Sequence, residues 1–210
     1  MPKFPEPPAG LAGLEPVEYL LPAGAVLSRV YFRGGPHPSD WRTMRAYGPV
    51  DARFDHHEPP PRTQDRRVLY AALDATTCLA EVFQRRRSID VRRREPWLVG
   101  FETRAALRLL DLTGVWPTRA GASMAINTGQ RARARRWARA IYAAYPQLHG
   151  IYYPSSMHAN RPALVLFERA EPALPAAPLT NRALADPLLE PYVRRAAAEL
   201  NYRLVGLRPG

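Results

Sequence analysis

Residues 68–83, VLYAALDATTCLAEVF, predict a buried strand followed by a tight turn and an amphipathic helix. The apolar run 68–73 has the length of a strand, and Asp74 ends it. Asp74 then suits a helix N-cap, because its carboxylate can accept from backbone N–H groups two or three residues on. The apolar positions of the helix have the spacing of one inward face: Leu79, Val82 and Phe83. Glu81 lies at the edge of that face, so the helix is expected to bring one carboxylate back beside the strand.

The rest of the chain contains more strand patterns than helix patterns. Further strands are predicted in pairs or singly: two within 17–32 around a turn at 22–24, then 97–101, 107–112, 148–153, 163–168 and 202–207. Further helices are predicted at 129–145 and 186–201. Because strands and helices do not alternate strictly, the order favours an α+β fold over a doubly wound sheet.

Length and composition predict one domain with a sizeable core. The chain has 210 residues, of which 46% are hydrophobic, and we expect a single domain at 17–210 after a loose, proline-rich extension at 1–16. Cys78 is the sole cysteine, so an intrachain disulfide is excluded, as is usual in a reducing compartment. No apolar run approaches the roughly 20 residues of a membrane span. The protein is therefore expected to be soluble and cytoplasmic, with no membrane partner.

The formal net charge of +11 comes almost entirely from arginine, since Lys3 is the sole lysine. Such a surface attracts polyanions of several kinds. The run 85–95 carries six basic side chains and is interpreted as a solvated helix end and loop. The arginines of 129–139 mostly face water, because the inner stripe of that helix is apolar: Trp137, Ile141, Tyr142 and Tyr145. A nucleic-acid-binding module built on these two segments is the alternative interpretation.

Residues 34–67 are polar and contain several prolines, including Pro59-Pro60-Pro61. A structureless stretch of this length inside a domain is usually functional or disordered. We expect a lid or pocket wall around 46–54.

Several kinds of site are excluded by pattern. No Walker A or G-x-G-x-x-G motif follows a predicted strand. The five histidines lack metal-ligand spacing with carboxylates or cysteine, so no metal site is expected. Cys78 lies among apolar neighbours on a helix, where inert packing is the usual role.

A set of isolated polar residues remains, at strand ends or within apolar strands: Arg29, Arg53, Tyr70, Glu81 and Ser155 or Ser156. Each has an ordinary explanation by itself, as an edge-strand charge, a core aromatic, a surface carboxylate or a turn residue. Together they gain weight, because pockets form at strand ends.

These residues lie in six short motifs that follow one another along the chain. The motifs are S-R-V-Y at 28–31, D-A-R-F at 51–54, V-L-Y-A-A at 68–72, T-T-C-L-A-E at 76–81, G-I-Y-Y-P-S-S at 150–156 and P-A-L-V-L-F at 162–167. In this order they resemble the RES domain family, which is named for its Arg, Glu and Ser. The resemblance extends from about residue 27 to residue 167.

The resemblance implies a fold similar to ADP-ribosyltransferase toxins, with two small packed β-sheets, flanking helices and a cleft for NAD. Characterised members are toxins of bacterial toxin/antitoxin pairs that destroy NAD, their substrate, by hydrolysis or phosphorolysis. Some relatives instead transfer ADP-ribose to a cellular protein. The antitoxin is an Xre-like helix-turn-helix protein that occludes the cleft. Direct binding of nucleic acid by this chain is not expected.

The resemblance also implies roles for two arginines and for Glu81. Cleavage of the nicotinamide–ribose bond passes through an oxocarbenium-like centre, which a fixed carboxylate stabilises, and Glu81 is the candidate. Arg29 and Arg53 suit the pyrophosphate of NAD, because arginine binds phosphate oxygens in pairs. Arg29 is counted with the catalytic residues.

The aromatic and hydroxyl groups of the motifs have implied roles too. Tyr70 offers a ring face to nicotinamide and a hydroxyl to ribose or phosphate. Ser155 matches the family serine better than Ser156, and would bind a substrate amide or ribose. It is counted with the catalytic residues, and both serines are counted with the NAD-binding residues. Tyr31 is the candidate for the aromatic that the family places next to its first arginine.

The motifs also depart from the family pattern at certain positions. Asp51 and Ala52 stand where glycines are common before the second arginine, and Val30 replaces the aromatic that follows the first. The chain lacks the E-x-E pair of arginine-specific transferases. The departure from E-x-E favours NAD breakdown over protein modification.

Overall fold

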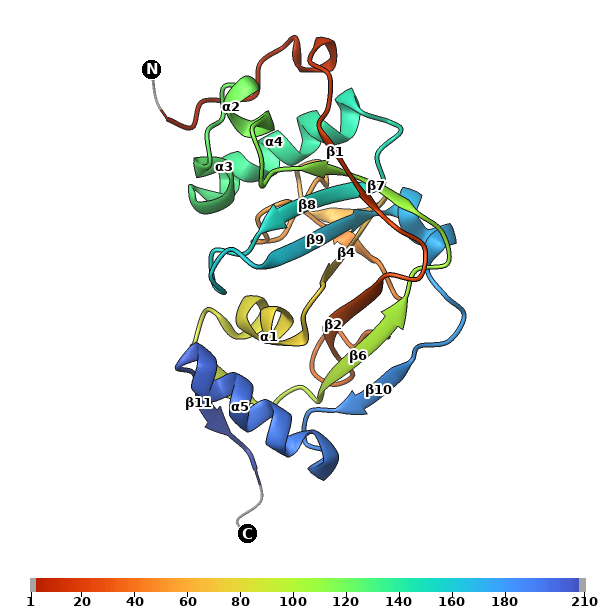
Figure 1. Ribbon diagram of the computed structural model, residues 1–210, viewed down its shortest axis with the longest axis vertical. Coiled ribbons are helices and arrows are strands. Elements are labelled where there is room, and N and C mark those ends of the chain that lie inside the picture. The colour runs from red at the N-terminus through yellow and green to blue at the C-terminus, as the bar shows by residue number, and fades with distance from the viewer. Residues whose placement is uncertain (1–2, 208–210) are drawn as a thin grey trace.

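The computed structural model describes residues 3–207, and its main feature is a nine-stranded sheet that is nearly divided in two (Figure 1). One half contains, in order, β1 (Glu18–Leu21), β7 (Leu107–Asp111), β8 (Gly150–Pro154), β9 (Pro162–Phe167) and β4 (Arg62–Ala72), with β3 (Arg45–Gly48) also paired to β4. The other half contains β2 (Val26–Phe32), β6 (Pro96–Glu102) and β10 (Thr180–Ala183). The halves meet at one residue pair, Ser28 of β2 with Ala72 of β4.

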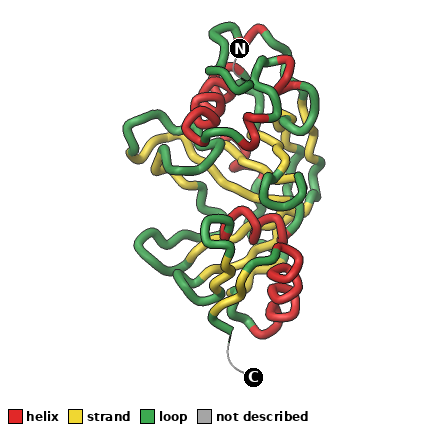
Figure 2. The backbone as a smooth tube through the Cα atoms, turned by 90° about the vertical axis from the view of Figure 1, so that its left-hand side faces the viewer, coloured by secondary structure: helices red, strands yellow, loops and turns green. Residues whose placement is uncertain are grey.

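The helices lie beside this sheet. They are α1 (Ala75–Phe83), α2 (Trp116–Arg119), α3 (Ala125–Thr128), α4 (Arg131–Ala144) and α5 (Glu190–Leu200), with 3-10 turns η1 (Leu11–Gly13), η2 (Glu168–Ala173) and η3 (Pro187–Leu189). A separate two-stranded sheet pairs β5 (Ser88–Asp90) with β11 (Arg203–Val205). Figure 2 shows α4 in the upper part of the molecule and α5 in the lower part.

The expected α+β class is confirmed, and the expected two sheets are continuous at the Ser28–Ala72 pair. Two hydrophobic clusters cover the two faces of the sheet. One cluster contains Val30 of β2 together with the buried residues of α1 and α4. The other contains Tyr31 of β2 and is covered by Trp41, Met44 and η2. Among residues 3–207 no helix has the length and apolar character that a membrane crossing requires.

The central strand and helix form where the sequence predicts them. Asp74 caps α1, and its side chain accepts from the Thr76 backbone N–H at 2.8 Å. The predicted inward face is partly wrong, because Val82 is 37% exposed. The face that packs on the sheet contains Thr76, Leu79 and Ala80 instead. Leu79 is buried as predicted, whereas Thr76 and Ala80 take the buried positions expected of larger apolar residues such as Val82.

Residues 34–67 are not a structureless lid. Residues 45–48 form β3 on β4, and β4 begins at Arg62, six residues before the predicted strand. The polar first half of β4 is only half-buried, which explains why apolar periodicity missed it. Asp55, His56 and His57 are completely buried, so this part of the segment packs into the domain, and a pocket wall at 46–54 stays a prediction.

The N-terminal extension is not loose either. Phe4 and Leu11 are buried against α4, and the Trp137 indole N–H donates to the Pro5 carbonyl at 2.8 Å. Glu6 pairs with the guanidinium of Arg136 at 2.5 Å. Apolar residues between the prolines thus attach the arm to the domain. The domain boundary at residue 16 stays a prediction.

Two carboxylates beside histidines, the buried Asp55 and the half-buried Glu168, make the stability of this fold depend on pH. Burial opposes ionisation of Asp55, but a hydrogen bond with His57 at 2.5 Å, the charge of Arg45 and the Val50 N–H lower its pKa to about 2. Burial likewise opposes ionisation of Glu168, whose pKa is lowered to about 2 by partners that include His56 and the Tyr142 hydroxyl.

The stabilisation from these two carboxylates is present above their ordinary pKa values near 4 and is lost as pH falls toward 2. The free energy of unfolding should therefore fall by about 3 kcal/mol between pH 6 and pH 3. Urea unfolding at several pH values measures this. Glu168→Gln should lower stability at pH 6 and flatten the curve, whereas a wild-type curve already flat over this range would contradict the assignment.

Candidate active site

Two motif residues that are far apart in sequence meet in the structure. Glu81 is on α1, and Ser155 directly follows β8. The Ser155 hydroxyl donates to Oε1 of Glu81 at 2.5 Å. The same Oγ accepts from the Met157 backbone N–H at 3.2 Å, which leaves the hydroxyl proton for the carboxylate. Ser155 is completely buried, and Glu81 is half-buried.

The connection between β8 and β9 holds Ser155 in place. The Ser155 N–H donates to the Arg161 carbonyl at 2.9 Å, which closes the loop. His158 anchors the loop to two helices, with Nδ1 at 2.8 Å from the Thr77 hydroxyl of α1 and Nε2 at 2.9 Å from Glu199 of α5. Ser156, the neighbour of Ser155, is exposed. The geometry therefore joins Ser155 and not Ser156 to Glu81.

Two tyrosines lie close to this pair in the buried layer. The Tyr70 hydroxyl is buried and makes no hydrogen bond within residues 3–207. Burial raises the pKa of Tyr70. Burial, and then the charge of Glu81, raise the pKa of Tyr153, a residue that the sequence analysis did not select. Both phenols are therefore protonated at neutral pH and can donate hydrogen bonds. A buried hydroxyl without a partner needs an explanation, and a ligand group is one.

Arg53 supplies positive charge on the same side. Its guanidinium donates to the Gly129 carbonyl at 2.6 Å and is half-buried. Burial and the nearby charge of Arg131 lower the pKa of Arg53, and the charge of Glu81 opposes this. Arg53, Glu81 and Arg131 thus act on one another electrostatically.

Arg29 and Tyr31 lie on the other face of β2. Alternate residues of a strand point to opposite faces, and Val30 packs with the α1 side. Arg29 instead donates to the carbonyls of Trp41 at 2.7 Å and Thr43 at 3.0 Å. The Tyr31 hydroxyl donates to Oδ1 of Asn181 at 2.9 Å.

The structure therefore does not bring Arg29 and Tyr31 together with Glu81. Burial lowers the pKa of Arg29 to about 10, which leaves it charged at neutral pH. Arg29 is the first β2 residue beyond the Ser28–Ala72 pair, where the two halves separate. Contact of Arg29 and Tyr31 with NAD stays a prediction.

Cys78 has the packing role that its setting indicates. It is buried, and its thiol donates to the Ser28 carbonyl at 2.9 Å. Burial raises the pKa of the thiol, so no nucleophilic thiolate is available at neutral pH.

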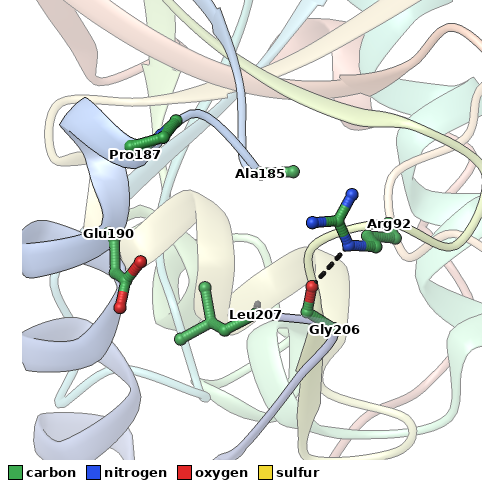
Figure 3. A pocket seen from close by; sticks show the side chains of 6 residues that line it. All are labelled: Arg92, Ala185, Pro187, Glu190, Gly206 and Leu207. Carbon is green, nitrogen blue, oxygen red and sulfur yellow. Dashed lines mark hydrogen bonds between the residues drawn. The ribbon is translucent and has the colours of Figure 1, made fainter. Parts of the chain in front are cut away.

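Two hollows on the surface lie apart from this pair of residues. One, of about 140 Å³, lies between the start of α5 and the segment that follows β11, and is shown in Figure 3. It is lined by Arg92, Ala185, Pro187, Glu190, Gly206 and Leu207. The other, of about 340 Å³, is lined by Arg42, Thr43, Met44, Arg67 and Glu171. Neither is lined by Glu81 or Ser155. Within residues 3–207 no three His, Cys, Asp or Glu side chains form a group that could hold a metal ion.

Comparison with known proteins connects this geometry to a family. A family model described as "RES domain" matches residues 27–188, more than half of the chain. The chain belongs to the RES domain family. The matched range includes all six motifs and extends 21 residues beyond the end of the resemblance seen in the sequence, from 167 to 188.

Solved structures agree with this RES domain in fold. A chain in the crystal structure of the M.tuberculosis MbcT-MbcA toxin-antitoxin complex superposes with a TM-score of 0.54 at 17% sequence identity. The similarity covers 84% of this RES domain protein and 92% of that chain. No curated protein matches the sequence.

Besides Tyr153, sequence reasoning missed Gln84, which donates to Glu81, and Arg131 of α4, which donates to Gln84. Gln84 could have been found, because residues three apart on a helix are neighbours. Arg131 is 47 residues from Gln84, and no local pattern signals that contact.

Proposed function

We propose that this RES domain protein cleaves the nicotinamide–ribose bond of NAD and is the toxin of a bacterial toxin/antitoxin pair. The contact between Ser155 and Glu81 carries the proposal. It joins the serine and the glutamate of the family motifs, 74 residues apart in sequence, in a partly buried position. A carboxylate held there suits chemistry that develops positive charge.

Glu81 acts on the ribose. As the bond to nicotinamide lengthens, positive charge develops at the ribose carbon and ring oxygen, and a fixed carboxylate stabilises that charge. A carboxylate can also accept a hydrogen bond from a ribose hydroxyl. Ser155 fixes one oxygen of Glu81, so the carboxylate does not reorganise during the reaction.

The neighbouring groups suit the remaining parts of NAD. The unpartnered Tyr70 hydroxyl can donate to a ribose or phosphate oxygen, and its ring can stack on nicotinamide. Arg53 can bind the diphosphate, because its charge lies near Glu81 on the same side of the sheet. Ser156 is the exposed neighbour of Ser155, and we assign it a contact with NAD only at the outer edge of the site.

Breakdown of NAD is favoured over transfer to a protein. Arginine-specific transferases use an E-x-E pair, and here Leu79 stands two residues before Glu81 and is completely buried. We therefore assign water or phosphate, and not a protein, as the molecule that accepts the ADP-ribose group.

A nucleic-acid-binding role has less support. The arginines of α4 are largely paired with carboxylates of the same chain: Asp51, Glu6 and Glu58. A carboxylate that pairs with an arginine offsets its positive charge, so these arginines attract nucleic-acid phosphates less strongly.

The partner assigned to this toxin is an Xre-like helix-turn-helix antitoxin that covers the site. The similar chain of known structure comes from a toxin-antitoxin complex, which supports this assignment. The helix-turn-helix character of the antitoxin comes from the family resemblance.

Adenine-labelled NAD, incubated with purified protein with and without phosphate, tests the proposal. Free labelled ADP-ribose is expected if water is the acceptor, and its phosphorylated form if phosphate is. Label that accumulates on a protein would replace this function with ADP-ribosyl transfer. Label that stays in intact NAD, with folded protein, would overturn the proposal.

A further inference from the structure

The Glu81 carboxylate has a second neighbour, on its other oxygen. Gln84, the C-cap residue of α1, follows Glu81 by three residues and still has helical backbone angles, and its Nε2 lies 3.2 Å from Oε2 of Glu81. The same Nε2 donates to the Glu81 carbonyl at 2.6 Å. With Ser155 on Oε1, both carboxylate oxygens are held.

The hydrogen bond with Arg131 fixes the orientation of the Gln84 amide. Its Oε1 accepts from Nη2 of Arg131 at 2.8 Å. A guanidinium can only donate, so the amide must present its oxygen to Arg131 and its N–H to Glu81.

Arg131 is itself anchored. It is the first residue of α4, and its Nη1 lies 3.0 Å from Oδ2 of Asp51. Arg135, one turn later, reaches the other oxygen of Asp51 at 3.3 Å but makes no hydrogen bond to Gln84. The hydrogen bonds therefore run from Asp51 through Arg131 and Gln84 to Glu81.

We propose that Gln84, held by Arg131, is a positioning residue that aims the Glu81 carboxylate at the ribose. This rests on the proposed function. The amide also separates two charges. Were Arg131 bonded directly to Glu81, its charge would neutralise the carboxylate that the oxocarbenium-like centre needs. A neutral amide orients the carboxylate by a hydrogen bond and leaves its charge available.

Steady-state kinetics of NAD cleavage test this. Gln84→Met keeps the length of the side chain and removes its hydrogen bonds. We expect kcat to fall about 10- to 100-fold, the size of a lost hydrogen bond to a charged group, with KM within about threefold of wild type. The thermal midpoint should stay close to that of wild type, because Gln84 is only half-buried.

A matched pair of arginine variants separates positioning from charge. Arg131→Gln should lower kcat about tenfold, and the double variant with Gln84→Met should be no worse than Gln84→Met alone. Arg135→Gln removes the same charge from the same helix and the same Asp51 partner, and should leave kcat unchanged.

Each result decides the proposal. Wild-type kcat in Gln84→Met, a change in KM alone, or equal losses in Arg131→Gln and Arg135→Gln would overturn the positioning role while NAD cleavage by the wild type stands. Absence of NAD cleavage by the folded wild type would overturn the proposed function and this role with it.

Discussion

Glu81→Gln should lower the rate of NAD cleavage about a thousandfold, into the background of the assay. The substitution removes the negative charge and changes the side-chain volume very little. An amide cannot offset the positive charge that develops on the ribose, although its oxygen can still accept a hydrogen bond from the Ser155 hydroxyl. Nicotinamide release, followed by chromatography at saturating NAD, measures the effect.

Glu190→Gln is the matched control for this variant. Glu190 is also a helix glutamate, in the first turn of α5, and it pairs with Arg194 at the surface. Its variant should cleave NAD at the wild-type rate, and both variants should keep the wild-type thermal midpoint. A folded Glu81→Gln protein with substantial activity would remove Glu81 from the mechanism.

Gly150→Ala should destabilise the fold by about 3 kcal/mol. A Cβ at Gly150 would lie 2.1 Å from the Val165 carbonyl oxygen and 3.0 Å from the Leu166 Cα, so the backbones of β8 and β9 would have to separate. Both strands are central in their half of the sheet, and β8 leads directly to Ser155. Urea unfolding at neutral pH measures the loss.

Gly10→Ala provides the comparison. A Cβ at Gly10 would meet nothing within 4 Å, and its φ of −89° suits alanine. That variant should be neutral or slightly more stable, because alanine reduces the freedom of the unfolded chain. If the Gly150→Ala protein were as stable as the Gly10→Ala protein, the result would contradict the close approach of the β8 and β9 backbones at Gly150.

The sequence predicts best where local signals agree. Asp74 can cap only a helix that begins immediately after it, and the apolar run before it is of strand length, so the unit that carries Glu81 is found at its correct place. The rotation of α1 is not predicted, because small residues such as Ala80 form its inner face and Val82 points outward. Burial of Ala or Thr in a helix has no strong sequence signal.

The candidate site is predicted in part for a similar reason. Glu81 and Ser155 lie in motifs that end or follow strands, and the fold brings them together. Arg29 and Tyr31 share a strand with Val30, but the sequence does not tell which face of β2 receives α1. The order of the family motifs along the chain identifies these residues as a group, but it does not tell on which face of the sheet each one lies.

The central claim is that the Glu81–Ser155 site consumes NAD, and nicotinamide release by the purified wild-type protein tests it most directly. The account predicts that nicotinamide appears in step with the loss of NAD. Full recovery of intact NAD from protein that is folded and free of any bound inhibitor would contradict it.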